Sequence, residues 1–408
     1  MHVQALETQY DVVIVGGGMV GTTFALNLAQ QINDCDYSIL VVEAVDSKNL
    51  DQQPSFDSRS TALSFGSRQI FEDMNLWSTI KQVVEPIIEI QISDRGHFGG
   101  TTLSNVEQSV EALGYVIENR ELGNVLREAM QASAGVSLLV PASITQMKPR
   151  QSGMELTVTG SEGSTKLSAK LVVLADGGRS SIRETLGIGQ SKTDYGQHAI
   201  ITNAAFERPH SGVAFERFTE SGPLAILPLS DFQESNRGAL VWTVSESSRE
   251  ELLRCDEETF RSALTQHFGE RLGRILQIGK RVAYPLSLTL AKEQVRPGLA
   301  LLGNVAHTLH PVAGQGLNLS LRDSAALVRH LVKAKQQQIA PGEMKVLQAY
   351  QESQIQDQLE SVMFTDQTVR FFSNNQLHFL ALRKLGLLSL ELLPSLRGRF
   401  ARSAMGMK

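Results

Sequence analysis

Three glycines near the start of the chain have the spacing of a phosphate-binding turn. Gly16, Gly18 and Gly21 form a Gly-x-Gly-x-x-Gly pattern. The first permits a tight turn, the second lets the backbone approach a pyrophosphate, and the third lets a following helix lie close to a sheet. The free N–H groups and the positive end of that helix would then face the phosphates. The pattern therefore predicts a bound nucleotide.

Glu43 supplies the acid that such a site requires. It lies about 20 residues beyond the glycines, at the end of an apolar run. Its carboxylate is expected to accept hydrogen bonds from the adenosine ribose hydroxyls. The alternative, a purely structural glycine turn, is disfavoured because the strand, helix and acid occur in the required order. This unit alone does not separate FAD from a nicotinamide cofactor.

The surrounding sequence predicts the elements that position these residues. The apolar runs 12–15 and 39–42 are typical of buried strands, and the segment 22–31 between them is typical of a helix. Strand, turn, helix and strand together make the βαβ unit of dinucleotide-binding folds.

A second glycine turn follows an apolar run at 299–302. Gly314 and Gly316 open a predicted helix, and the start of a helix stabilises negative charge. Two such helix starts fit a ligand with two separated electron-rich parts, which favours FAD, with its pyrophosphate and its reduced ring, over a nicotinamide cofactor alone. The inner face of this helix is expected to comprise Leu317, Leu321, Ser324, Val328 and Leu331.

Three segments together resemble the aromatic hydroxylases of the para-hydroxybenzoate hydroxylase fold. They are the glycine turn 16–21, the Asp-Gly segment 175–183 and the segment 303–323. Within that group, the sequence Phe-Glu-Arg-Phe-Thr at 215–219 and the run His-Pro-Val-Ala-Gly-Gln-Gly-Leu-Asn at 310–318 are most similar to the ubiquinone-biosynthesis hydroxylases. The resemblance implies FAD as the bound cofactor, NAD(P)H and dioxygen as co-substrates, and a polyprenylated phenol as the substrate.

The resemblance also implies roles for individual residues. Pro311, Gly314, Gln315 and Gly316 are expected to lie against the reacting flavin ring. The remaining FAD contacts are expected from the first glycine turn and its acid, from the Asp-Gly segment, and from positions along the second segment. The complete cofactor-binding set is Gly16, Gly18, Gly21, Glu43, Arg59, Asn119, Asp176, Gly177, Asn304, Gly316, Leu317 and Asn318.

Asn304 departs from the family pattern, which usually has an aspartate at this position to hold the ribityl chain. Asparagine can donate as well as accept a hydrogen bond, but it carries no charge. FAD binding is still expected, with reduced affinity.

Arg217 and Phe218 are candidates for the substrate pocket, against the alternative of an exposed and a buried residue on an ordinary strand. His307 and His310 could ligate a metal, but loop shaping or packing beside the flavin is favoured, because nothing else in the sequence supports a metal site. We therefore predict no metal.

Composition excludes several protein classes. The chain has 408 residues, enough for more than one domain, and a formal net charge of −5, which gives no electrostatic basis for nucleic-acid binding. The two cysteines form neither a metal cluster nor a disulfide framework, which indicates a reducing compartment. The first ten residues lack the features of a signal peptide, and no apolar stretch is long enough to span a membrane. A cytoplasmic location is expected.

The predicted fold is α/β. It has a Rossmann-like FAD-binding domain, an inserted and mostly antiparallel β substrate domain, and a helical C-terminal region. The FAD-binding domain is assigned to residues 1–80, 108–192 and 281–340, the substrate domain to 81–107 and 193–280, and the helical region to 341–408.

The C-terminal region contains a leucine-rich stretch, Gln376–Leu393, that is followed by Arg397, Arg399 and Arg402. A helix that covers the first domain is favoured. The alternative is peripheral contact with the inner face of a membrane or with a partner of a ubiquinone-biosynthesis complex. The sequence assigns no oligomeric state.

The predicted function is FAD-dependent hydroxylation of a 2-polyprenyl-6-methoxyphenol with NAD(P)H and dioxygen in ubiquinone biosynthesis. The first alternative is a related hydroxylase that acts on another ring carbon or another aromatic compound. The second is a flavin-dependent prenyl-chain reductase, which would consume NAD(P)H without incorporating oxygen. The third is a flavin-binding assembly subunit with no turnover.

Overall fold

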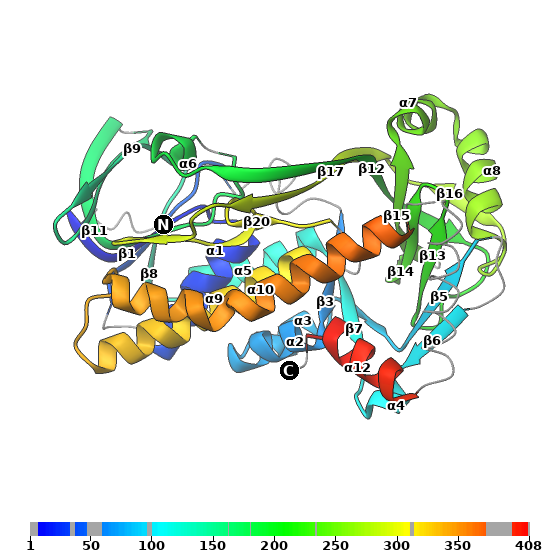
Figure 1. Ribbon diagram of the computed structural model, residues 1–408, viewed down its shortest axis with the longest axis horizontal. Helices are drawn as coiled ribbons and strands as arrows, with labels where there is room; N and C mark the ends of the chain where they lie inside the picture. The colour runs from blue at the N-terminus through cyan, green and yellow to red at the C-terminus, as the bar shows by residue number, and fades with distance from the viewer. Residues whose placement is uncertain are drawn as a thin grey trace.

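Three sheets and their covering helices make up the computed structural model (Figure 1). It describes residues 7–32, 37–46, 59–95, 100–161, 163–179, 181–232, 235–310, 314–372 and 394–406.

The first sheet contains the predicted βαβ unit. Its strand order is β18-β19-β11-β1-β2-β8, and β1 pairs in parallel with both β2 and β11. Helix α1 connects β1 to β2, so the prediction of a dinucleotide-binding unit is confirmed. Strands β9 and β10 extend the sheet as an antiparallel hairpin. The bounds are β1 Gln9–Val15, α1 Met19–Gln31, β2 Ile39–Val42, β8 Val136–Leu139, β9 Ala142–Arg150, β10 Gly153–Gly160, β11 Gly163–Leu174, β18 Val295–Arg296 and β19 Leu299–Leu301.

Strand β11 differs from the prediction. From the sequence, 166–169 is predicted as the second strand of a hairpin with alternating faces, and the continuous apolar run 171–175 as a separate buried parallel strand. The structure has one strand that pairs antiparallel with β10 and parallel with β1. Lys170 does not break it because its exposed ammonium forms an ion pair with Asp11 at 2.7 Å.

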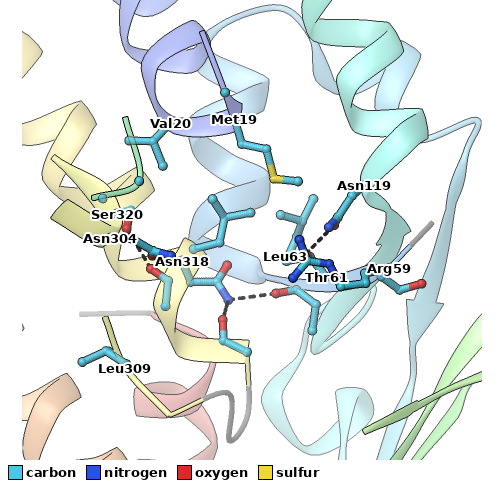
Figure 2. Close-up of a pocket in the computed structure, with 18 of the residues that line it drawn as sticks. Met19, Val20, Arg59, Thr61, Leu63, Asn119, Asn304, Leu309, Asn318 and Ser320 are labelled. Atoms are coloured by element: carbon cyan, nitrogen blue, oxygen red, sulfur yellow. Dashed lines mark hydrogen bonds between the residues drawn. The ribbon is translucent and has the colours of Figure 1, made fainter. Parts of the chain in front are cut away.

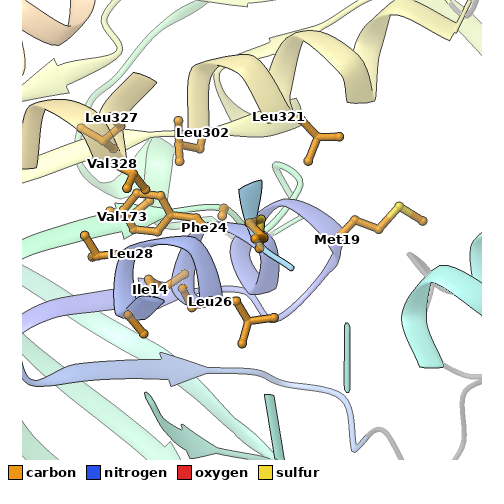
Figure 3. Close-up of a cluster of buried hydrophobic side chains, with 14 of the residues drawn as sticks. Ile14, Met19, Phe24, Leu26, Leu28, Val173, Leu302, Leu321, Leu327 and Val328 are labelled. Atoms are coloured by element: carbon orange, nitrogen blue, oxygen red, sulfur yellow. The ribbon is translucent and has the colours of Figure 1, made fainter. Parts of the chain in front are cut away.

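Helix α1 is buried along nearly its whole length, because it lies between the first sheet and two other helices. These are α5 (Asn119–Ala132) and α9 (Gln315–Gln336). Phe24 and Leu28 of α1 meet Leu327 and Val328 of α9, and all four are fully buried (Figure 3). Burial of each such side chain contributes about 1.5–3 kcal/mol. This packing fixes the starts of α1 and α9 relative to each other, and both starts lie at the candidate site.

The second sheet contains the predicted inserted strands. Its order is β20-β17-β12-β15-β14-β13-β5-β6, and all its pairs are antiparallel except β13–β5. The prediction of a mostly antiparallel inserted sheet is confirmed. Helices α7 and α8 pack on its outer side. The bounds are β5 Glu89–Asp94, β6 Gly100–Ser104, β12 Gln190–Phe206, β13 Val213–Thr219, β14 Gly222–Phe232, β15 Ser235–Ser245, α7 Glu246–Arg254, α8 Glu257–Phe268, β16 Ile275–Ile278, β17 Val282–Ala291 and β20 His307–Thr308.

Strands β12 and β17 are long enough to join the two halves of the molecule. They pair antiparallel from Gln190↔Ala291 to Ile201↔Val282, with one irregularity in the register. Figure 1 shows this pair running from the first sheet to the second.

A small third sheet lies between the other two. Its strands are β3 (Ser60–Ser64), β7 (Gly114–Glu118) and β4 (Val84–Ile87), in the order β3-β7-β4. The sequence also predicts a helix at about 66–74, and the structure has it as α2 (Phe65–Asp73). It begins where the hydroxyl of Ser64 accepts a hydrogen bond from the Ser67 amide.

The C-terminal part described by the structure is helical. It comprises α10 (Met344–Phe372) and α12 (Pro394–Ala404). The leucine-rich stretch Gln376–Leu393 lies outside the described residues. Among the described helices, none combines the length and the apolar character needed to cross a membrane.

Candidate active site

A cavity of about 770 Å³ connects the first sheet with the second. One end is lined by the glycine turn after β1, by Glu43 after β2 and by Asp176 after β11. The start of α9 lines the middle, and apolar residues of β13, β14 and β15 line the other end. The carboxyl ends of parallel strands are where open α/β sheets bind ligands.

The first glycine turn is as tight as the sequence predicts. Gly16 has a φ of 106°, and a Cβ on it would lie 2.6 Å from the Ala175 carbonyl oxygen. A Cβ on Gly21 would lie 2.0 Å from the Gly16 carbonyl oxygen, so Gly21 supports the turn without lining the cavity. Gly18 directly precedes α1 and does line the cavity.

The carboxylate of Glu43 is held beside this turn. One oxygen accepts from the Gly17 amide at 2.5 Å, and the other accepts from the Val45 amide at 2.9 Å. A carboxylate oxygen can accept more than one hydrogen bond, so Glu43 keeps capacity for ribose hydroxyls.

The Asp-Gly segment forms a turn at the edge of the cavity. Asp176 accepts a hydrogen bond from the Gly178 amide at 2.9 Å. Gly177 has a φ of 71°, and a Cβ on it would meet nothing within 4 Å. The backbone at Gly177 therefore faces open space in the cavity that both residues line.

The start of α9 forms the second glycine turn. Gly314 has a φ of 62°, and a Cβ on it would lie 3.1 Å from Ala62. Gly316 lines the cavity, and a Cβ there would meet nothing within 4 Å. Gln315 is buried and is not part of the cavity wall, while Pro311 lies outside the described residues.

Asn318 fixes this helix start by hydrogen bonds. Its side-chain amide donates to the carbonyl oxygens of Ala62 (2.8 Å) and Gly314 (2.7 Å). Its carbonyl oxygen accepts from the Ser64 amide (2.8 Å) and the Ser67 hydroxyl (2.7 Å). Both donors and both acceptor positions are used, so the side chain positions α9. Asn318 lines the cavity, and its contact with FAD stays a prediction.

Arg59, Thr61 and Asn119 lie together across the cavity from Asn304 and Asn318 (Figure 2). The Thr61 hydroxyl donates to Asn119 Oδ1 at 2.7 Å, and the Arg59 guanidinium lies 4.7 Å from the centre of the Tyr284 ring. The structure thus places both predicted residues, Arg59 and Asn119, on the cavity wall.

The residues present fit FAD. Glycines form the wall where a pyrophosphate must approach the backbone, and two helix starts face the same cavity. The backbone at Gly177 and Gly316 leaves space that side chains would fill. Such a cradle suits an elongated ligand with negative charge at two points.

Comparison with known proteins agrees with this geometry. The family model described as "FAD binding domain" matches residues 9–356. The chain belongs to this FAD-binding family. A ubiquinone hydroxylase of Rhodospirillum rubrum is 37% identical over 97% of this chain and 89% of its own length. The 3-demethoxyubiquinol 3-hydroxylase of Escherichia coli is 32% identical over 97% of this chain and 98% of its own.

Solved structures confirm the fold of this FAD-binding protein. The p-nitrophenol 4-monooxygenase of Pseudomonas putida superposes with a TM-score of 0.78 over 99% of this chain and 100% of its own, at 17% identity. A probable FAD-dependent monooxygenase of Pseudomonas aeruginosa gives a TM-score of 0.75, at 20% identity, over 93% of this chain and all of its own.

Asn304 is the position at which the sequence departs from the pattern of FAD-binding hydroxylases. It is exposed between buried Gly303 and Val305 and lines the cavity, and its backbone oxygen accepts from the Thr308 hydroxyl at 3.0 Å. We expect Asn304→Asp to keep FAD bound, with a dissociation constant within about tenfold of the natural protein, because either side chain can accept a ribityl hydroxyl. Flavin fluorescence titration measures this constant. Loss of flavin would mean that the position requires a donor or a neutral group.

The structure places neither Arg217 nor Phe218 on the cavity wall, which corrects the prediction for both. Side chains alternate between the faces of a strand. Arg217 points to the outer face, where it donates to the Phe268 carbonyl oxygen at 2.9 Å. Phe218 is on the inner face but is buried in the apolar cluster beyond the cavity. Their neighbour Glu216 lines the cavity instead.

The two histidines have different surroundings. His307 is buried and forms a hydrogen-bonded pair with Asp323, with 2.7 Å between Nε2 and Oδ2. His310 lines the cavity, and burial lowers its pKa to about 4, so it is neutral at pH 7. Within the described residues, no group of three or more histidine, cysteine or acidic side chains could hold a metal ion. The His307–Asp323 pair ties the segment before α9 to that helix, and the absence of a metal stays a prediction.

Proposed function

We propose that this protein is a FAD-dependent monooxygenase that hydroxylates a polyprenylated phenol in ubiquinone biosynthesis, with NAD(P)H and dioxygen. The observation that carries this function is the single cavity that joins the glycine turn to the apolar face of the second sheet. A flavin held at the turn and an aromatic ring held against the apolar face would share this one cavity.

The residues of the chain have separate tasks in this reaction. Bound FAD supplies the reduction of dioxygen and the transfer of one oxygen atom to the ring. The turn at Gly16 and Gly18 and the carboxylate of Glu43 hold the adenosine and pyrophosphate part. The start of α9 at Gly314 and Gly316 stabilises negative charge on the ring system. The apolar wall of β13, β14 and β15 excludes water.

The names of the relatives support this choice of pathway. The Rhodospirillum rubrum relative is a ubiquinone hydroxylase, and the Escherichia coli relative is a 3-demethoxyubiquinol 3-hydroxylase. We assign 2-polyprenyl-6-methoxyphenol as the substrate. Hydroxylation of another ring carbon is the second candidate, because the Escherichia coli relative is named for a different quinol. Peripheral contact with a membrane stays a prediction.

Purified protein tests the proposal directly. We expect a yellow protein with a flavin absorption spectrum, whose NAD(P)H oxidation is accelerated by 2-polyprenyl-6-methoxyphenol, and whose product contains one atom from labelled dioxygen. Acceleration and labelling with 3-demethoxyubiquinol alone would select the other ring carbon. Oxidation of NAD(P)H with no label in any product would favour a reductase, and a colourless protein that cannot be reconstituted with FAD would overturn the proposal.

A further inference from the structure

The inner face of the second sheet carries one carboxyl group in an otherwise apolar row. Strand register places five residues side by side across the sheet: Ile92 of β5, Glu216 of β13, Ala225 of β14, Val241 of β15 and Ile201 of β12. Directly paired residues share a face of the sheet. All of these except Ile92 line the cavity.

Glu216 has no protein partner in this row. It forms no hydrogen bond or ion pair with any residue that the structure describes, and burial is what raises the pKa of its carboxyl group. Among the described residues of the second sheet's strands β5, β6 and β12–β15 that line the cavity, it is the only ionisable one. Glu216 is partly exposed to the cavity, and a carboxyl without a partner in a largely apolar wall is costly. Its presence there points to a ligand that supplies a hydrogen-bond donor.

We propose that Glu216 is a catalytic residue that binds the phenol hydroxyl of the substrate and accepts its proton. This inference rests on the proposed function. The hydroxyl O–H bond breaks, a new O–H bond forms on a carboxylate oxygen, and the electron pair stays on the phenol oxygen. Resonance then carries this electron density to the ring carbons ortho and para to that oxygen, which makes them more reactive toward the incoming oxygen atom. The proton returns to the phenol oxygen after oxygen transfer, when the new ring carbon loses its own hydrogen as a proton.

The acidity of Glu216 suits this task. Burial raises the pKa of its carboxyl to about 7. A base is most effective when its pKa lies near the working pH, and a phenol has an ordinary pKa of about 10. Proton transfer to a carboxylate of ordinary acidity would be considerably less favourable.

The other charged groups near Glu216 lie on the same face of the sheet or elsewhere along the cavity. His310, with its lowered pKa, is already neutral above pH 5 and does not change charge near pH 7. On the inner face of the sheet, Asp94 lies two positions beyond Ile92, and Arg237 of β15 is paired with Glu118 at 2.9 Å. The remaining charged residues of the cavity line its nucleotide end or the loops beside it: Glu43, Arg59, Asp176 and Arg179.

The variant Glu216→Gln tests the proposal, because it keeps the shape of the side chain and removes the proton acceptor. Glu220→Gln is the matched control, since Glu220 is exposed in the turn after β13. Both variants should retain FAD in full. We expect Glu216→Gln to lower the hydroxylation rate about 100-fold or more and to remove the acidic limb of the kcat/KM profile near pH 7. The control should match the natural protein in both respects.

A binding measurement separates proton transfer from a structural role. The oxidised, FAD-loaded protein is mixed with 2-polyprenyl-6-methoxyphenol at pH 8 without NAD(P)H, and an ultraviolet difference spectrum is recorded. The natural protein should show the red-shifted absorption of a phenol whose hydroxyl donates a charge-assisted hydrogen bond to a carboxylate, and Glu216→Gln should lack this shift. The methyl ether of the same phenol should give no such signal with either protein.

Each outcome has a definite meaning. Hydroxylation by Glu216→Gln within about threefold of the natural rate, with an unchanged acidic limb, would overturn the role of Glu216 while leaving the proposed function intact. A natural protein that binds FAD but neither binds nor hydroxylates the phenol would overturn both. Should Glu216→Gln fail to fold, Glu216→Asp decides: it should keep the acidic limb at a lower rate, and an acidic limb that is absent would contradict the proposal.

Discussion

Replacement of Gly316 by leucine is expected to give a folded protein that no longer retains FAD. A Cβ at this position meets no other atom within 4 Å, so the side chain would extend into the cavity rather than into the protein. The unfolding free energy of the cofactor-free protein should change by no more than about 1 kcal/mol, because glycine is a poor helix former and nothing is displaced. FAD affinity should fall at least about 100-fold, since the leucine occupies space that the flavin needs.

Gly398→Leu is the control for this experiment. Gly398 lies in α12, where a Cβ would come no closer than 3.9 Å to any atom, and it does not line the cavity. This variant should keep its flavin. For each protein, the absorption spectrum after gel filtration measures how much FAD is retained, and a urea unfolding curve measures the free energy of unfolding. Full flavin occupancy in Gly316→Leu would show that the cofactor does not approach the start of α9.

The second large effect is expected at Asn318. Asn318→Leu removes four hydrogen bonds at once. The buried amide of Ser64 and hydroxyl of Ser67 and the half-buried carbonyl oxygens of Ala62 and Gly314 all lose this partner. Each unsatisfied buried group costs about 1–3 kcal/mol, so the unfolding free energy should fall by about 4 kcal/mol or more. Because the start of α9 loses its attachment to β3 and α2, FAD affinity should fall as well.

The control makes the same substitution, asparagine to leucine, at an exposed position. Asn304→Leu should change the unfolding free energy by less than about 0.5 kcal/mol, because Asn304 is exposed. Urea unfolding of both variants without FAD makes the comparison. Equal stability of Asn318→Leu and the natural protein would mean that the four contacts add nothing to the fold.

The sequence predicted the first sheet and its glycine turn well, because local signals define both. The order of strand, turn, helix and acid around Gly16 and Glu43 occurs within one short stretch. The second glycine turn was recognised for the same reason. The continuous strand β11 was not, since only its ion pair with Asp11, far away in sequence, shows why Lys170 does not interrupt it.

The substrate wall was the weakest part of the prediction, for a physical reason. Both faces of β13 are covered, one by α8 and the other by the cavity and its apolar cluster. Apolar residues therefore occur on both faces, at Phe215 and at Phe218, and alternation does not show which face is inner. Arg217 was chosen, although its neighbour Glu216 is the residue that lines the cavity. At Asn318 the sequence could not show that the side-chain amide is already used by hydrogen bonds to Ser64 and Ala62.

The paired strands β12 and β17 have a consequence for exchanging parts between related enzymes. The second sheet takes its strands from separate stretches of the chain, because β5 and β6 precede β7 while β12 to β17 follow β11. A chimera that carries a foreign 190–291 segment would also need the matching 89–104 segment, or the β13–β5 ladder would join mismatched surfaces. Substrate preference in this architecture is thus inherited as two linked pieces of sequence.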